Sequence, residues 1–234
     1  MQGGTEGTGK RSLADAAYEA VRGAILRCEL PPGQQVTEAQ LEHRFGCGRA
    51  AVRAALTRLC QERLVQAIPR HGYAIAPITF KDVHDLFGLR LIIEPAAARL
   101  AAERCDRALA DELEELNRAC THTRDSNDVA ALRNANRAFH AAVARAARNE
   151  RLAELVCVVL EELDRVLYLP HLANVWERID ATYAEHERII GALAARDAET
   201  AAQAAYEHIL PNKQFIIEAL TSSPGLRSVN LAGI

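Results

Sequence analysis

Three histidines in the second half of the sequence, His140, His186 and His208, occupy apolar faces of predicted helices. Asn136 precedes His140 by one helical turn, so both side chains can reach one metal ion. A single inward-facing histidine is more often a hydrogen-bonded core residue than a ligand. Three such histidines and an amide, spread over three helices, favour a metal site in the core of a helical bundle.

A second group of residues has the chemistry of DNA recognition. Arg49, Arg53 and Thr57 recur every four residues on a helix face that carries no apolar side chain. Arginines near the N-terminus of a recognition helix can reach guanine edges or phosphates in the major groove. The alternative is that they are solvated helix charges. The turn of the hairpin expected after this helix suits an adjacent phosphate or the minor groove, and its residues are Arg70, His71 and Gly72.

The elements that must position the arginines predict a winged helix-turn-helix. An amphipathic helix is expected over Leu13–Arg27, and a recognition helix over Arg49–Arg63. Between them Thr37 and Gln40 have the spacing of a capping box, which predicts a short helix to about Arg44. Residues 64–68 and 73–76 can then pair as two strands around residues 69–72, and this hairpin forms the wing.

The rest of the chain predicts an antiparallel all-helical bundle with no strand. Apolar residues recur at three- and four-residue steps, most clearly in the fourth of the six helices expected there. We therefore expect a mainly α protein of two domains, residues 10–78 and 79–222, joined by a short linker. The six helices are Lys81–Arg104, Ala108–Arg124, Val129–Ala147, Glu150–Leu169, Val175–Ala195 and Ala198–Leu220.

Composition excludes several classes of protein. The 234 residues are 49% hydrophobic and 25% charged, which is typical of a globular chain with a sizeable core. No window approaches the run of roughly 18 apolar residues that a membrane span needs. The six cysteines lie far apart without a CxxC pair, which favours a reducing, cytoplasmic setting over disulfides. Lysine and arginine outnumber acidic residues only in the first domain, where a nucleic-acid partner is expected.

The first domain resembles the winged helix of GntR-family transcription regulators. The resemblance lies in Pro32-Gly33, Leu41, the segment Phe45–Leu56, Leu64-Val65 and the segment Arg70–Tyr73. It implies that Arg49 and Arg53 contact bases and phosphates of double-stranded DNA. Gly48 stands where the family usually has serine or threonine, so the recognition helix is expected to lack a side-chain cap.

The second domain resembles the FCD-type effector domain of the FadR-like branch of that family. The matching segments are Leu89–Ala97, Asn136–His140, Asn149–Leu152, Glu185–Ile190 and His208. The resemblance implies a divalent metal ion held by Asn136, His140, His186 and His208. Three imidazoles and one oxygen suit Zn²⁺ or Ni²⁺. Asparagine replaces the usual aspartate at Asn136, which leaves the site one negative charge short.

The open coordination positions of such an ion can accept a carboxylate from a small organic acid. Arg90, on the inward edge of its helix, is a candidate second clamp for this effector. An i, i+4 salt bridge from Arg90 to Glu94 is an equally weighted alternative.

The expected function is a metabolite-responsive DNA-binding regulator rather than an enzyme. A homodimer would bind an inverted-repeat operator, and repression relieved by the effector is the commoner arrangement in the family. Two alternatives stay open: a metal-dependent hydrolase in the helical half, and a metal-free structural dimerisation bundle. Glu185 and Glu187 are the only nearby candidates for a general base, and both are expected to point away from the face of His186.

Overall fold

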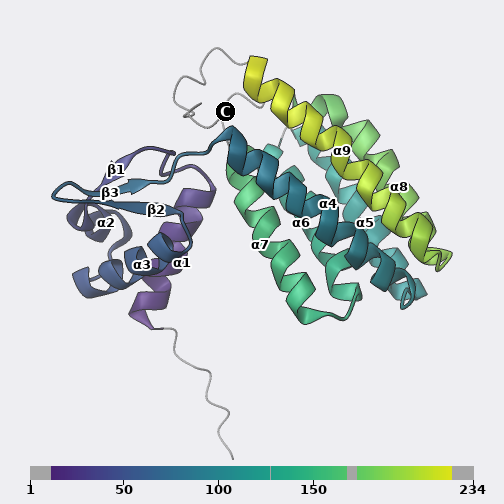
Figure 1. Cartoon of the computed structure of the whole chain (residues 1–234), viewed down its shortest axis with the longest axis horizontal. Helices are drawn as coiled ribbons and strands as arrows, with labels where there is room; N and C mark the ends of the chain where they lie inside the picture. Colours follow the sequence, from purple (N-terminus) through teal and green to yellow (C-terminus); the bar gives the residue numbers. More distant parts are fainter. Residues whose placement is uncertain (1–11, 127, 168–172, 223–234) are drawn as a thin grey trace, which may run out of the picture. The chain divides into compact units, whose positions relative to one another are not determined.

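The computed structural model describes residues 12–126, 128–167 and 173–222. The chain divides into two compact units, unit 1 (Met1–Pro77) and unit 2 (Ile78–Ile234). The mainly α fold class is confirmed, because helices dominate both units and the strands of the described residues form one small sheet in unit 1 (Figure 1). Over these same ranges, no helix is both long enough and apolar enough to cross a membrane.

The three helices of unit 1 are α1 (Leu13–Leu26), α2 (Glu38–Phe45) and α3 (Arg49–Gln61). The capping box predicted at the start of α2 is confirmed: the Thr37 hydroxyl accepts from the Gln40 amide at 3.2 Å, and the Gln40 side chain accepts from the Thr37 amide at 2.9 Å. The expected absence of a side-chain cap at Gly48, before α3, is confirmed as well. Caps and breakers therefore fix both helices locally.

The wing is a three-stranded antiparallel sheet in the order β1-β3-β2. The predicted hairpin is present as β2 (Val65–Ile68) and β3 (Gly72–Ile75). A third strand, β1 (Gln35–Val36), pairs with β3 and was not predicted. Two residues are too few to give an alternating pattern, so only the hydrogen bonds to β3 define this strand.

Unit 2 is the predicted helical bundle, and each observed end lies within two residues of the expected one wherever both can be compared, apart from the start of α8. Helix α4 packs against α6, α7, α8 and α9, and α5 packs against α6 and α8 (Figure 1). The helices are α4 (Phe80–Ala102), α5 (Arg107–Ser126), α6 (Val129–Ala146), α7 (Glu150–Leu167), α8 (Ile179–Ala194) and α9 (Ala198–Ser222).

One helix end differs from the prediction. The helix expected from Val175 begins instead as a 3₁₀ turn, η1 (Ala173–Arg178), which leads into α8. A 3₁₀ turn and an α-helix share nearly the same spacing of apolar residues over two turns, so the sequence does not separate them. The predicted extension of α7 to residue 169 lies outside the described residues.

Candidate metal centre and nucleic-acid interface

The three predicted histidines meet inside unit 2. His140 comes from α6, His186 from α8 and His208 from α9, and all three side chains are buried. Each offers a ring nitrogen, and the three nitrogens lie within 4.8 Å of one another. Residues 46 and 22 positions apart in the chain thus share one point, because α6, α8 and α9 all pack around α4.

Each imidazole is held by a hydrogen bond at its Nδ1 atom. The partners come from three different helices, and the pairs are His140 with Glu94 at 2.8 Å, His186 with Asn117 at 3.0 Å and His208 with Glu185 at 2.9 Å. The Phe139 ring stacks on His186 with a centroid separation of 3.9 Å. Fixing Nδ1 orients each ring and leaves Nε2 available as the ligand atom. The Nε2 atom of His208 lies 3.3 Å from Asn212 Nδ2, so this amide is the neighbour that a metal ion would displace.

The inward-facing nitrogens have the properties of metal ligands. The Nε2 atoms of His140 and His186 are buried and have no hydrogen-bond partner. Burial lowers the pKa of His186 and His208 well below the usual 6.5, so both imidazoles stay neutral at pH 7. Neutral imidazoles with a free lone pair are the form that binds a divalent ion, and an orphaned buried nitrogen is otherwise costly. The donor set therefore fits a divalent metal.

The contacts behind the histidines were not predicted from the sequence, apart from the ion pair between Arg90 and Glu94. Glu185 accepts no hydrogen bond from His186, which agrees with the expectation that it points away from that residue's face. Its side chain contacts His208 of α9 instead. Arg178 donates to Glu185 at 2.7 Å, and Arg90 forms an ion pair with Glu94. These partners hold the two carboxylates that hold the histidines.

Asn117, the hydrogen-bond partner of His186, was not singled out from the sequence, and it is fully buried on α5. Its Oδ1 atom accepts from His186, while its Nδ2 atom donates to Glu187 and to the Tyr183 carbonyl. The sequence indicates this role only weakly: Asn117 follows the apolar Leu113 by one helical turn, so it lies on the same buried face, where a polar side chain needs hydrogen-bond partners.

A cavity of about 110 Å³ opens beside the histidines, lined in part by His208, Asn136 and Arg90. Asn136 and His208 therefore line the same cavity. Arg90 forms the ion pair with Glu94 that was its alternative prediction, and it also lines the cavity. Its role as a clamp for an effector stays a prediction. The structure adds a polar lining from η1 and α9, with Arg178 and Asn212.

The recognition helix of unit 1 presents its predicted residues to solvent. The side chains of Arg49 and Arg53 are 72% and 60% exposed. Both donate to Glu38 at the start of α2, Arg49 at 3.1 Å and Arg53 through two nitrogens at 2.9 Å. These hydrogen bonds hold the pKa of Glu38 at about 2. Thr57 bonds internally, because its hydroxyl donates to the Arg53 carbonyl at 3.0 Å.

Glu38 was not among the predicted residues. It precedes the arginines by eleven and fifteen positions, so no local spacing connects them. Only the packing of α2 against α3 brings the carboxylate to the two guanidinium groups.

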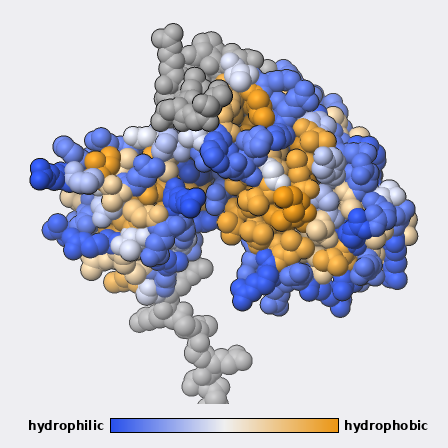
Figure 2. Space-filling model, viewed as in Figure 1, coloured by the Kyte–Doolittle hydropathy of each residue, from blue (hydrophilic) through white to orange (hydrophobic). Residues whose placement is uncertain are grey.

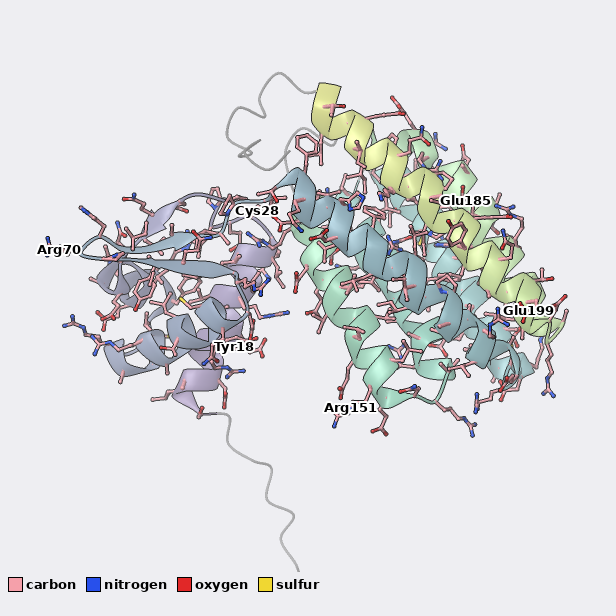
Figure 3. The ribbon with its side chains drawn as sticks, in the orientation of Figure 1. Tyr18, Cys28, Arg70, Arg151, Glu185 and Glu199 are labelled. Atoms are coloured by element: carbon pink, nitrogen blue, oxygen red, sulfur yellow. The ribbon has the colours of Figure 1, made fainter. Side chains whose placement is uncertain are left out.

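At the wing, Arg70 and His71 are exposed, and Figure 3 shows Arg70 at the tip of the hairpin. The structure gives a reason for glycine at position 72 that the sequence analysis did not give. Its φ is +89°, and a Cβ there would lie 2.8 Å from the Val36 carbonyl oxygen. Gly72 therefore allows β1 to approach β3, whatever its part in DNA contact.

Two family models match the chain. The one described as "Bacterial regulatory proteins, gntR family" matches residues 13–75, and the FCD domain matches residues 85–210, which is more than half of the chain. The chain belongs to the GntR family of transcription regulators and carries an FCD domain. Members of this family bind DNA to regulate transcription and are not enzymes, which removes the hydrolase alternative.

Relatives of this GntR regulator cover most of its length. YdhC, an HTH-type transcriptional regulator of Bacillus subtilis, is 26% identical over 82% of this chain and 85% of its own. The transcriptional repressor GlaR of Escherichia coli is 25% identical over 88% and 96%. Among solved structures, E. coli McbR/YncC has the same fold, with a TM-score of 0.77 at 20% identity over 89% of this chain and 99% of that one. A GntR regulator from Rhodococcus sp. RHA1 gives 0.74 at 22% identity, over 89% and 99%.

Proposed function

We propose that this GntR regulator is a metal-dependent sensor of a small carboxylate, and that it represses transcription until the effector binds. The observation that carries the proposal is the convergence of three buried imidazoles, each held at its Nδ1 atom, beside a cavity. The names of two relatives support the sense of regulation, since GlaR and RspR of Escherichia coli are both described as repressors.

The proposed metal ligands are His140, His186 and His208, with the Asn136 amide oxygen as the fourth. Zn²⁺ or Ni²⁺ suits this set, and the effector carboxylate would complete the coordination. The test is elemental analysis of the purified protein and of His186→Ala. Wild type should hold about one divalent ion per chain, and the variant much less. His84→Ala, at an exposed position of α4, is the matched control. A wild-type protein that binds no added Zn²⁺ or Ni²⁺ would favour the structural bundle instead.

The proposed DNA contacts are Arg49, Arg53 and Thr57 in the major groove and the wing tip beside it. Replacing both arginines, as in Arg49→Gln with Arg53→Gln, should abolish specific binding in a mobility-shift assay. Arg151→Gln, on α7 of unit 2, is the control because its side chain is 93% exposed and lies outside the DNA-binding unit. Specific binding retained by the double variant would refute this assignment.

We propose a homodimer on an inverted-repeat operator. Unit 2 exposes large apolar side chains on α4 and α7, namely Leu89, Ile92, Leu155 and Val158. Figure 2 shows apolar surface gathered over these two helices. Such a contiguous patch is typical of a protein–protein interface, so Ile92→Glu should give monomers in analytical ultracentrifugation. A variant that remains dimeric would place the interface elsewhere.

A further inference from the structure

The three histidines of the cluster differ in how their ring nitrogens are occupied. Each has a partner at Nδ1, but the Nε2 atoms of His140 and His186 have none. Of the three, only His208 has a second neighbour: Asn212 Nδ2 lies 3.3 Å from its Nε2 and 3.5 Å from its Nδ1, which Glu185 already holds. Two of the proposed ligand atoms are thus open, and the third is covered by an amide.

The contacts around Asn212 fix the orientation of its amide. Arg178 Nε can only donate, and it donates to Asn212 Oδ1 at 3.2 Å, so the atom at that position must be the oxygen. On the other side of the amide, Nδ2 donates to the His208 carbonyl at 2.9 Å. Both contacts require the same orientation, and Asn212 therefore presents its NH₂ group rather than its oxygen to the imidazole.

An NH₂ donor and a metal ion compete for the same lone pair on His208. Nδ1 faces the Glu185 carboxylate, which only accepts, so Nε2 is the nitrogen that carries the lone pair. This lone pair either accepts a hydrogen from Asn212 or binds a cation. A metal ion at His208 therefore requires Asn212 to leave its position. Because Arg178 holds the oxygen of the same amide, that movement also takes the oxygen away from Arg178.

Arg178 connects this contact to the cavity. It is the last residue of η1, it lines the cavity of about 110 Å³, and it donates through a second nitrogen to Glu185 at 2.7 Å. Glu185 in turn holds His208 Nδ1 at 2.9 Å. Arg178 thus contacts the partner of each ring nitrogen of His208. A change at Nε2 can therefore reach η1 and the cavity wall through this one side chain.

We propose that Asn212 is a gate for the metal site, and that metal binding releases it from both His208 and Arg178. The Nε atom of Arg178 then becomes a hydrogen-bond donor at the cavity that a carboxylate ligand can use, while Glu185 keeps the other end of the guanidinium group. The inference rests on the proposed metal site and adds an order to it, because release of Arg178 prepares the cavity for the effector. Asn212 and Arg178 are positioning residues here and not ligands.

The chain contains its own reporter for this change. Its single tryptophan, Trp176, is partly buried in η1, two residues before Arg178. Tryptophan emission depends on the surroundings of the indole ring, so a change in what holds Arg178 should alter it. Zn²⁺ is the suitable probe because it is a d¹⁰ ion without redox chemistry, and an emission change then reports the surroundings of Trp176 rather than quenching by an open-shell ion.

The test follows Trp176 emission while Zn²⁺ is added to the chelator-treated, full-length protein, and a chromophoric chelator measures Zn²⁺ affinity in parallel. Wild-type emission should change and saturate at about one Zn²⁺ per chain. In Asn212→Ala, emission before Zn²⁺ is added should already be close to that of the loaded wild type. This variant should bind Zn²⁺ about five-fold more tightly, because one competing hydrogen bond is gone. Gln214→Ala, at an exposed position two residues further along α9, is the control and should behave as wild type.

The possible results separate this inference from the proposed function. A wild-type protein that binds no Zn²⁺ overturns the metal site, and the gate with it. Zn²⁺ binding without a change in Trp176 emission overturns the release of Arg178 and leaves the metal site intact. Unchanged or weaker Zn²⁺ affinity in Asn212→Ala, with circular dichroism showing a folded variant, overturns the gate, since Asn212 would then not compete with the ion.

Discussion

The contact between Glu185 and His208 makes a sharp prediction about metal affinity. Glu185 Oε2 lies 2.9 Å from His208 Nδ1, and its other oxygen accepts from Arg178 at 2.7 Å. The substitution Glu185→Gln keeps the size of the side chain but removes the negative charge. Hydrogen bonds to a charged acceptor are roughly twice as strong as neutral ones, and the amide can serve only one of the two partners as an acceptor with its single oxygen.

Loss of such an outer partner typically lowers metal affinity about 10- to 100-fold, which corresponds to about 1.4–2.7 kcal/mol. We expect this loss for Zn²⁺ or Ni²⁺ in Glu185→Gln, measured by competition with a chromophoric chelator at pH 7.5. Folding should be affected less, because Arg178 keeps its hydrogen bond to Asn212 at 3.2 Å.

Glu207→Gln is the matched control for this experiment. Glu207 is next to His208 on α9, but it is exposed and accepts from Arg188 and Gln203 rather than from a residue of the histidine cluster. Its metal affinity should stay within about three-fold of wild type. Wild-type affinity in Glu185→Gln, or an equal loss in both variants, would refute the claim that the Nδ1 partner tunes the site.

Three further predictions concern stability and DNA binding. Gly72→Ala should destabilise unit 1 by about 2 kcal/mol or more, because Gly72 has a positive φ and an added Cβ would lie 2.8 Å from a backbone oxygen. Calorimetry should show a lower melting temperature for this variant. Gly88→Ala is the control and should not lower the melting temperature, because an added Cβ at Gly88 meets no neighbouring atom within 4 Å. The pKa values of His186 and His208 lie below the 6.5 of an unfolded histidine, so the unfolded chain binds more protons, and metal-free protein should lose stability as the pH falls below 6.5. The slope for the two histidines should approach about 2.7 kcal/mol per pH unit near pH 5 in urea unfolding, and a flat profile would contradict the burial of neutral imidazoles. Glu38→Gln releases both recognition arginines, so the affinity for non-specific DNA should rise and the ratio of specific to non-specific binding should fall. The slope of log affinity against log salt concentration should steepen by about one. An unchanged slope would mean that Glu38 does not restrain the two arginines.

Local sequence determined the elements and the polar residues that they carry. Caps and breakers act within a few residues, so Thr37, Gln40 and Gly48 identified the ends of α2 and α3 before any packing was considered. Periodicity likewise gave the helices of unit 2, and the positions of His140, His186 and His208 on apolar faces placed them inside it. The elements that were not predicted are short or irregular: β1, with two residues, and the 3₁₀ turn before α8.

Only the tertiary structure decided which groups touch across helices. Glu94, Asn117 and Glu185 lie on α4, α5 and α8, and each holds a histidine from a different helix at a separation of 23 to 69 residues. A hydrogen bond depends on the relative rotation and depth of two packed helices, which the periodicity of either one leaves undetermined. The sequence by itself thus placed polar atoms in the core, where each needs a partner, and the packing of the helices selected the partners.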